Sequence, residues 1–169
     1  MPLSKAELNA ALNDLAKSYA NNAVSILGEN IVSIALYGSV ARVQAGPTSD
    51  IDLFVVLKQA PSGMLARRRL PAPVRESLTP NLESLWMQGV YADFVEVIRT
   101  VAEARLYHPL YLDMSREAIL LHDRDRFLEK LLDNVGERLK REGAVRKTMG
   151  RFWYWDLSGL PTPEEVMHQ

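Results

Sequence analysis

The chain reads IVSIALY-GSVARVQAGPTS-DIDLFVVL over residues 31–57. The two outer segments, 31–37 and 50–57, are short, apolar and rich in β-branched residues, which predicts two buried strands. The segment between them opens on Gly38 and Ser39, and its composition predicts a short helical turn followed by a loop. The stretch therefore predicts a strand–turn–strand unit whose turn begins with a glycine.

Helices and further strands are expected on both sides of this unit. In chain order they are a helix that begins at the capping box Ser4/Glu7 and ends at Gly28, a loop over 60–72, a helix capped by Thr79, a strand over 90–98, a helix opened by the capping box Thr100/Glu103, a short strand over 118–121, and a long helix capped by Asp125 and ended by Gly143. This order predicts an α+β (α/β) protein with one domain over residues 1–169, in which a core of about 28–100 precedes a helical C-terminal extension of about 101–169.

Composition excludes several classes of protein. The 169 residues include no cysteine, so a disulfide framework and a thiolate zinc site are both excluded. The chain has no apolar run long enough for a membrane span and no secretory signal, which favours a cytoplasmic protein. A net charge of −1 does not favour nucleic acid as the partner, although local basic clusters such as Arg67–Arg69 fit either a solvated surface or a rim for an anionic partner.

Gly38 and Ser39 have the features of a phosphate-binding turn. A helix that starts directly after a strand has backbone N–H groups without an intrahelical partner and carries partial positive charge at that end. Glycine lets the backbone approach a ligand closely, and the Ser39 hydroxyl adds a donor. Gly-Ser turns are common, so the aspartates that follow decide the interpretation.

Asp50 and Asp52 are two residues apart on the second predicted strand. Side chains at this spacing point to the same face, so the two carboxylates are expected side by side while Ile51 and Leu53 fill the other face. Adjacent carboxylates repel each other and lose solvation on burial, and a divalent cation relieves both costs. Mg²⁺ prefers a few carboxylates together with substrate phosphates, so the pair predicts a magnesium site.

A third carboxylate would complete a two-metal site, in which two ligands hold the metal on a triphosphate and all three hold a second metal. The segment 90–98, VYADFVEVI, offers Asp93 and Glu96. Alternation places these two side chains on opposite faces of the strand, so only one can join the pair. The apolar residues that flank Asp93 favour it over Glu96 as the third ligand.

Three segments together carry a family resemblance: Gly-Ser-Val-Ala-Arg at 38–42, Ser-Asp-Ile-Asp-Leu at 49–53 and Tyr-Ala-Asp-Phe-Val at 91–95. In this order they resemble the signature of the DNA polymerase beta nucleotidyltransferase superfamily. Within it the chain is similar to the small, antitoxin-like group called minimal nucleotidyltransferases. The resemblance covers about residues 30–100 closely and the later residues more loosely.

The resemblance implies a polymerase-beta-like fold with a mixed sheet, ATP or another nucleoside triphosphate as donor, and Mg²⁺ as cofactor. It assigns nucleotide binding to Gly38, Ser39 and Arg42, and catalysis and metal binding to Asp50, Asp52 and Asp93. Small members of the family commonly have glycine after the Ala-Arg pair, where this chain has Val43. The loop after Arg42 is therefore expected to bend differently, which leaves the role of Arg42 open.

The expected activity is transfer of a nucleoside monophosphate, AMP from ATP, to a hydroxyl group with release of pyrophosphate. The resemblance implies a toxin of the HEPN class as one acceptor, because minimal nucleotidyltransferases often modify such partners. The alternatives are transfer to RNA 3′ ends or a small molecule, and a nucleotide-binding module without catalysis. Trp153, Tyr154 and Trp155 fit either packing on the core, which is favoured, or a platform for base stacking.

Overall fold

The computed structural model describes residues 2–150 and 152–158. The helices are α1 (Lys5–Leu27), α2 (Gly38–Ala41), α3 (Met64–Arg69), α4 (Ala72–Ser77), α5 (Thr79–Met87), α6 (Val101–Ala104), α7 (Leu110–Glu117) and α8 (Phe127–Arg141), with two 3-10 turns, η1 (Gly28–Asn30) and η2 (Arg124–Arg126). The strands are β1 (Ile31–Tyr37), β2 (Ile51–Leu57), β3 (Phe94–Thr100), β4 (Ile119–Asp123), β5 (Val145–Met149) and β6 (Phe152–Asp156).

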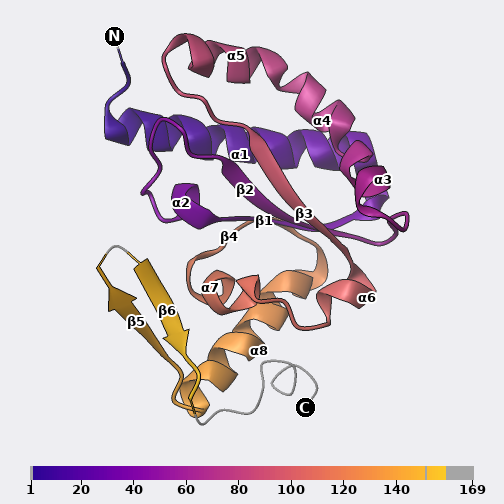
Figure 1. The fold of residues 1–169 in the computed structure, drawn as a ribbon. Coiled ribbons are helices and arrows are strands. Elements are labelled where there is room, and N and C mark those ends of the chain that lie inside the picture. Colours follow the sequence, from indigo (N-terminus) through magenta and orange to yellow (C-terminus); the bar gives the residue numbers. More distant parts are fainter. Residues whose placement is uncertain (1, 151, 159–169) are drawn as a thin grey trace.

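Four strands form a mixed sheet in the order β3-β2-β1-β4, as Figure 1 shows. Strand β1 pairs antiparallel with both β2 and β4, whereas β2 and β3 run parallel. The register places Tyr37, the last residue of β1, opposite Asp52 near the start of β2. The α2 turn, which follows Tyr37 directly, is thus brought to the carboxylate pair. The mixed α/β architecture expected from the sequence is confirmed.

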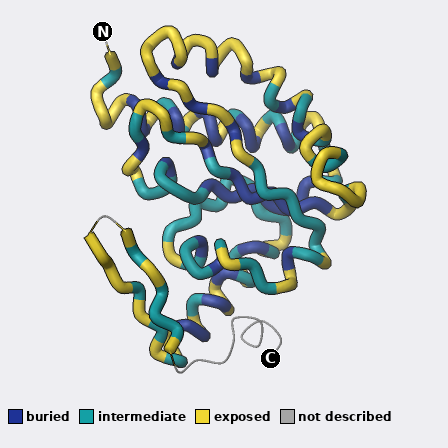
Figure 2. The backbone as a smooth tube through the Cα atoms, in the orientation of Figure 1, coloured by how far each residue is buried: buried dark blue, intermediate teal, exposed yellow. Residues whose placement is uncertain are grey.

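Helices cover both faces of this sheet (Figure 1), and its central strands are largely buried (Figure 2). Each face has its own apolar cluster. Leu53 and Val55 pack on the face covered by α1, α4 and α5. Phe54 and Val56 pack on the opposite face, against α6, α7 and α8. Strand β2 is therefore buried on both sides, which explains its nearly continuous apolar sequence. Asp52 alternates with Phe54, so it belongs to the α7 face.

Several expected elements agree with the structure and others need correction. The Ser4/Glu7 and Thr100/Glu103 capping boxes are both present. The segment 60–72, expected as a loop, contains α3, which is held by hydrogen bonds from Arg67 to Glu103 at 2.6 and 2.8 Å. Thr79 is the first residue of α5, not its cap. These differences arise because contacts across the fold outweigh local propensity.

The expected caps and strands of the C-terminal part also need correction. Asp125 does not cap α8; Asp123 does, because its carboxylate accepts from the backbone N–H groups of Leu128 and Glu129 at 2.9 Å each. The described part of the expected extension contains helices α6 to α8 and also an antiparallel hairpin of β5 and β6. The third strand begins at Phe94, so Asp93 lies just before it. Among the described residues, no helix combines the length and apolar character needed to cross a membrane.

Candidate active site

The turn between β1 and α2 touches the carboxylate of Asp52. Gly38 has φ +75°, a left-handed conformation that glycine adopts without strain. A Cβ atom built on Gly38 would lie 2.3 Å from Oδ2 of Asp52, far inside the contact distance. No side chain fits at this position without moving the carboxylate. The glycine therefore has a defined role, which is to let the backbone turn pack against Asp52.

Asp52 is half-buried, and its surroundings disfavour its negative charge. Burial raises the pKa of Asp52, the neighbouring charge of Asp50 raises it further, and the positive charge of Arg42 opposes both effects. Asp50 itself is exposed. Across the strand pair, burial and the Asp52 charge raise the pKa of the Tyr37 hydroxyl to about 12. The region thus concentrates negative charge that one arginine only partly compensates.

Two carboxylates of this region, those of Asp50 and Asp52, suit a divalent cation. Asp50 and Asp52 supply hard carboxylate oxygens, and a cation between them would relieve the repulsion that raises the pKa of Asp52. Among residues 2–150 and 152–158, however, no three His, Cys, Asp or Glu side chains are grouped so that they could hold a metal ion. The structure therefore brings two of the three expected carboxylates together.

Asp93 lies close by in the backbone but its carboxylate is engaged locally. The carbonyl oxygen of Asp93 accepts from the N–H of Ile51 at 2.8 Å, so the β2–β3 pairing continues to this residue. Its side-chain Oδ1 accepts from the N–H of Phe94 at 2.7 Å. Glu96 is on the α1 face, where it binds Arg75 at 2.9 and 3.1 Å. A role for Asp93 as third ligand stays a prediction.

Ser39 and Arg42 occupy the two ends of the short helix α2. Ser39 is its second residue, and the Ser39 carbonyl accepts from Gln44 N–H at 2.8 Å. The Arg42 guanidinium donates from Nε to Gln44 at 3.2 Å and from Nη1 to Glu117 at 3.3 Å. Glu117 belongs to α7 and was missed by sequence reasoning, because no local pattern links positions so far apart in the chain.

Val43 shows how the departure from the family pattern is accommodated. Its φ is 57°, so the backbone keeps the left-handed conformation that a glycine would favour there. The Val43 side chain is 63% exposed and gains little from packing. The expectation that the loop bends differently from that of other family members stays a prediction. At Val43 itself, a β-branched residue holds a strained conformation, which costs about 1–2 kcal/mol.

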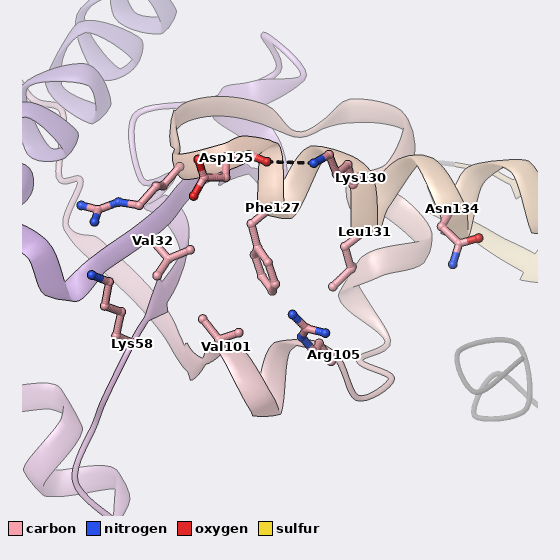
Figure 3. Close-up of a pocket in the computed structure, with 10 residues that line it drawn as sticks. Val32, Lys58, Val101, Arg105, Asp125, Phe127, Lys130, Leu131 and Asn134 are labelled. Carbon is pink, nitrogen blue, oxygen red and sulfur yellow. Dashed lines mark hydrogen bonds between the residues drawn. The ribbon is translucent and has the colours of Figure 1, made fainter.

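A separate hollow, drawn in Figure 3, lies where β1 begins and β2 ends. It has a volume of about 750 Å³ and combines apolar residues such as Val32 and Phe127 with the cations Lys58, Arg105 and Arg124. Lys58 and Arg124 both pair with Glu29, at 3.5 and 2.5 Å. Because Val32 lies near the start of β1 and Gly38 follows its end, this hollow is separate from the Gly38–Asp52 site.

Comparisons with known proteins agree with this arrangement. The family model of the nucleotidyltransferase domain matches residues 18–110, more than half of the chain. A protein of Methanocaldococcus jannaschii named "Putative protein adenylyltransferase MJ1305" is 25% identical over 130 residues, which cover 77% of this chain and 84% of the relative.

Two solved structures have a lower similarity. One is a toxin–antitoxin with AMP-PNP, with a TM-score of 0.42 and 18% identity over 73% of this chain and 91% of the other. The second is a mutant of the toxin–antitoxin MntA-HpeT, with a TM-score of 0.41 and 16% identity over 78% and 92%. The family assignment rests on the domain model and on the motifs. The chain belongs to the nucleotidyltransferase domain family and is an enzyme of the transferase class.

Proposed function

We propose that this nucleotidyltransferase transfers AMP from ATP to a hydroxyl group of a partner protein, with Mg²⁺ held by Asp50 and Asp52. The observation that carries the proposal is the contact between the Gly38 turn and the Asp52 carboxylate. It supports the proposal because backbone amides of such a turn suit phosphate and the adjacent carboxylates suit a metal. The oxygens of a triphosphate can accept from the backbone amides and bind the metal at the same time.

The reaction is an in-line displacement at the α-phosphorus of the donor. The acceptor oxygen forms a bond to this phosphorus, the bond to the bridging oxygen breaks, and pyrophosphate leaves. Bound Mg²⁺ would supply positive charge to the phosphoryl oxygens. The α2 turn would orient the phosphates, and Asp93 is the proposed base that takes the proton of the acceptor hydroxyl.

Two observations support a protein acceptor. The relative from M. jannaschii is named for protein adenylyl transfer, and the alignment covers most of its length. The net charge of −1 suits a partner with one complementary patch better than a polyanionic RNA, whose affinity depends on many phosphate contacts. A HEPN-class toxin is the acceptor that the resemblance to minimal nucleotidyltransferases implies.

The test uses α-labelled ATP and Mg²⁺ with the purified protein. One reaction contains the product of the neighbouring gene, a second contains total transfer RNA, and a third contains neither. The expected result is label on the partner protein and an intact-mass increase of one or more AMP units. Asp52→Asn serves as the matched inactive control, because it keeps the shape of the side chain and removes its charge.

The other outcomes separate the alternatives. Label on RNA 3′ ends with an unmodified partner would assign the protein to the RNA-modifying members of the family. Tight Mg²⁺-ATP binding without release of pyrophosphate in any reaction would assign it to the non-catalytic nucleotide-binding class. The first result overturns the proposed acceptor, and the second overturns the proposed transfer.

A further inference from the structure

The C-terminal hairpin lies beside α7 (Figure 1), and its side chains contact Asp113 and Glu117 of that helix. In β6, Trp153 and Trp155 alternate with Phe152 and Tyr154, which are 76% and 50% exposed. The two indole Nε1 groups donate to the same carboxylate oxygen of Asp113, at 3.3 and 2.9 Å. Both tryptophans therefore lie on the inner face, and that face is fastened to α7.

The same inner face reaches the active-site turn. The guanidinium carbon of Arg42 lies 4.5 Å from the centre of the Trp153 ring. Arg146 of β5 lies over the same ring at 4.3 Å. Between the two arginines, Glu117 accepts from Arg42 through one oxygen at 3.3 Å and from Arg146 through the other at 2.8 Å.

These contacts restrict an arginine that would otherwise be mobile. A free arginine side chain loses rotamer freedom when it binds phosphate, so an arginine that is already fixed binds at a lower entropic cost. The Arg42 side chain is held from three sides, by Gln44, Glu117 and the Trp153 ring. Its hydrogen bonds to Gln44 and Glu117 use Nε and Nη1, so Nη2 can donate to a phosphate oxygen.

A purely structural anchor would not require this arrangement. The hairpin is already attached to α7 through Asp113, and Trp155 joins the apolar cluster of that face. Trp153 adds a contact to Arg42, which belongs to the strand–turn–strand unit and lies four positions after Gly38. The charge of Arg42 also acts on Asp52, so the arginine links the hairpin to the carboxylate pair.

We propose that the hairpin is part of the active site and that Trp153 is a positioning residue. Together with Glu117, Trp153 holds the Arg42 guanidinium where it meets the triphosphate of the donor nucleotide. This inference rests on the proposed function. It assigns a role in nucleotide affinity to Trp153 and Glu117, which lie outside the family motif.

The test compares Trp153→Ala, Trp153→Phe, Arg42→Ala and the Trp153→Ala/Arg42→Ala double variant. Steady-state transfer gives KM for Mg²⁺-ATP and kcat, calorimetry gives the nucleotide Kd, and melting curves report folding. Trp153→Ala is expected to raise KM and Kd about tenfold with a smaller change in kcat, and Trp153→Phe should restore most of the affinity. The matched control is Phe152→Ser on the outer face of the same strand, which should leave KM and Kd unchanged.

The double variant separates positioning from general stability. If Trp153 acts through Arg42, the double variant binds no more weakly than Arg42→Ala alone, because coupled residues are not additive. Additive losses, or an unchanged KM in Trp153→Ala while Asp52→Asn is inactive, would overturn this inference and leave the proposed function intact. A wild-type protein that neither binds nor transfers nucleotide refutes both. If Trp153→Ala does not fold, Glu117→Gln takes its place with the same expectation.

Discussion

Asp52 and Glu96 lie on neighbouring parallel strands, one on each face of the sheet, and their surroundings differ. The Glu96 carboxylate is 7% exposed and is bound by Arg75, and it also accepts from the Tyr19 hydroxyl at 3.0 Å. Within the described residues, the Asp52 carboxylate accepts no hydrogen bond, and Asp50 adds a like charge beside it. A buried carboxylate with its full set of partners stabilises a fold, whereas one left without them is available to a ligand.

The largest expected effect is the loss of transfer activity when Asp52 or its neighbour Asp50 is changed. Asp52→Asn and Asp50→Asn should each lower transfer by about 10³-fold or more, because a lost metal ligand removes several kcal/mol of transition-state stabilisation. In the absence of Mg²⁺ the variants should melt at the same temperature as the wild type or higher, since they relieve like-charge repulsion. Pyrophosphate release and melting curves with and without Mg²⁺-ATP measure both effects. A full ligand-induced melting shift in either variant would contradict the metal assignment.

Gly38→Ala tests whether the close approach of turn and carboxylate is required. The new Cβ would lie 2.3 Å from Asp52 Oδ2 at a residue with φ +75°, so we expect transfer to fall by about 10²-fold. The left-handed conformation adds a stability loss of about 1–2 kcal/mol. Gly46→Ala is the matched control in the same loop, because nothing lies within 4 Å of where its new Cβ would be and its φ is not left-handed. Equal losses in both variants would show that the contact is unimportant.

On the other face, Glu96→Ala should affect stability and leave the chemistry intact. Removing Glu96 takes from Arg75 its carboxylate partner and leaves it the bond to the Arg68 carbonyl, so the expected cost is about 1–3 kcal/mol of unfolding free energy. At a temperature where the variant is folded, its kcat should equal that of the wild type. Asp93→Ala should show the reverse, with unchanged stability and lost transfer but retained Mg²⁺-ATP binding. An active Asp93→Ala together with an inactive, folded Glu96→Ala would reverse the assignment of the two faces.

The sequence predicts the elements from α1 to β2 well because their signals are local. The capping box at Ser4 and the apolar run of β1 each depend on neighbouring residues, and both appear where they were expected. The pairing of Asp50 with Asp52 likewise follows from strand alternation alone. A glycine next to these aspartates could be expected to bind phosphate, but its contact with Asp52 depends on the register of β1 and β2.

The parts that were missed depend on contacts between distant positions. Helix α3 is held through Arg67 by Glu103, and the hairpin is held by tryptophans on Asp113. Glu117 joins the site only because α7 lies beside both Arg42 and the hairpin. Such contacts leave no periodic pattern in one sequence, so composition suggested a loop and a helical extension instead.

Val43 offers a smaller test within the active-site loop itself. Val43→Gly should raise the unfolding free energy by about 1 kcal/mol, because relief of left-handed strain exceeds the entropic cost of glycine in the unfolded chain. The unfolding free energy of Val43→Asn should lie between those of the wild type and Val43→Gly, since asparagine tolerates this conformation. Denaturant unfolding of the three proteins measures the order. A less stable Val43→Gly would mean that the exposed side chain contributes more than the strain costs.

The smallest expected effect is a pair of opposite pH dependences, measured without metal. Glu103 binds Arg67 and its pKa is lowered from 4.5 to about 2, so its contribution to stability is present above pH 4.5 and is lost as pH falls toward 2. This contribution should stay below about 1 kcal/mol, because the pair is partly exposed. The pKa of Asp52 is raised, so the stability linked to its protonation is present at low pH and is lost as pH rises through that pKa. Denaturation should be measured across the acidic pH range. Glu103→Gln should be less stable than the wild type at neutral pH and should approach its stability in acid. Asp52→Asn should be more stable than the wild type at neutral pH and should also approach its stability in acid. Parallel pH curves for Asp52→Asn and the wild type would show that Asp52 is as well compensated as Glu96, and the contrast between the two faces would be lost.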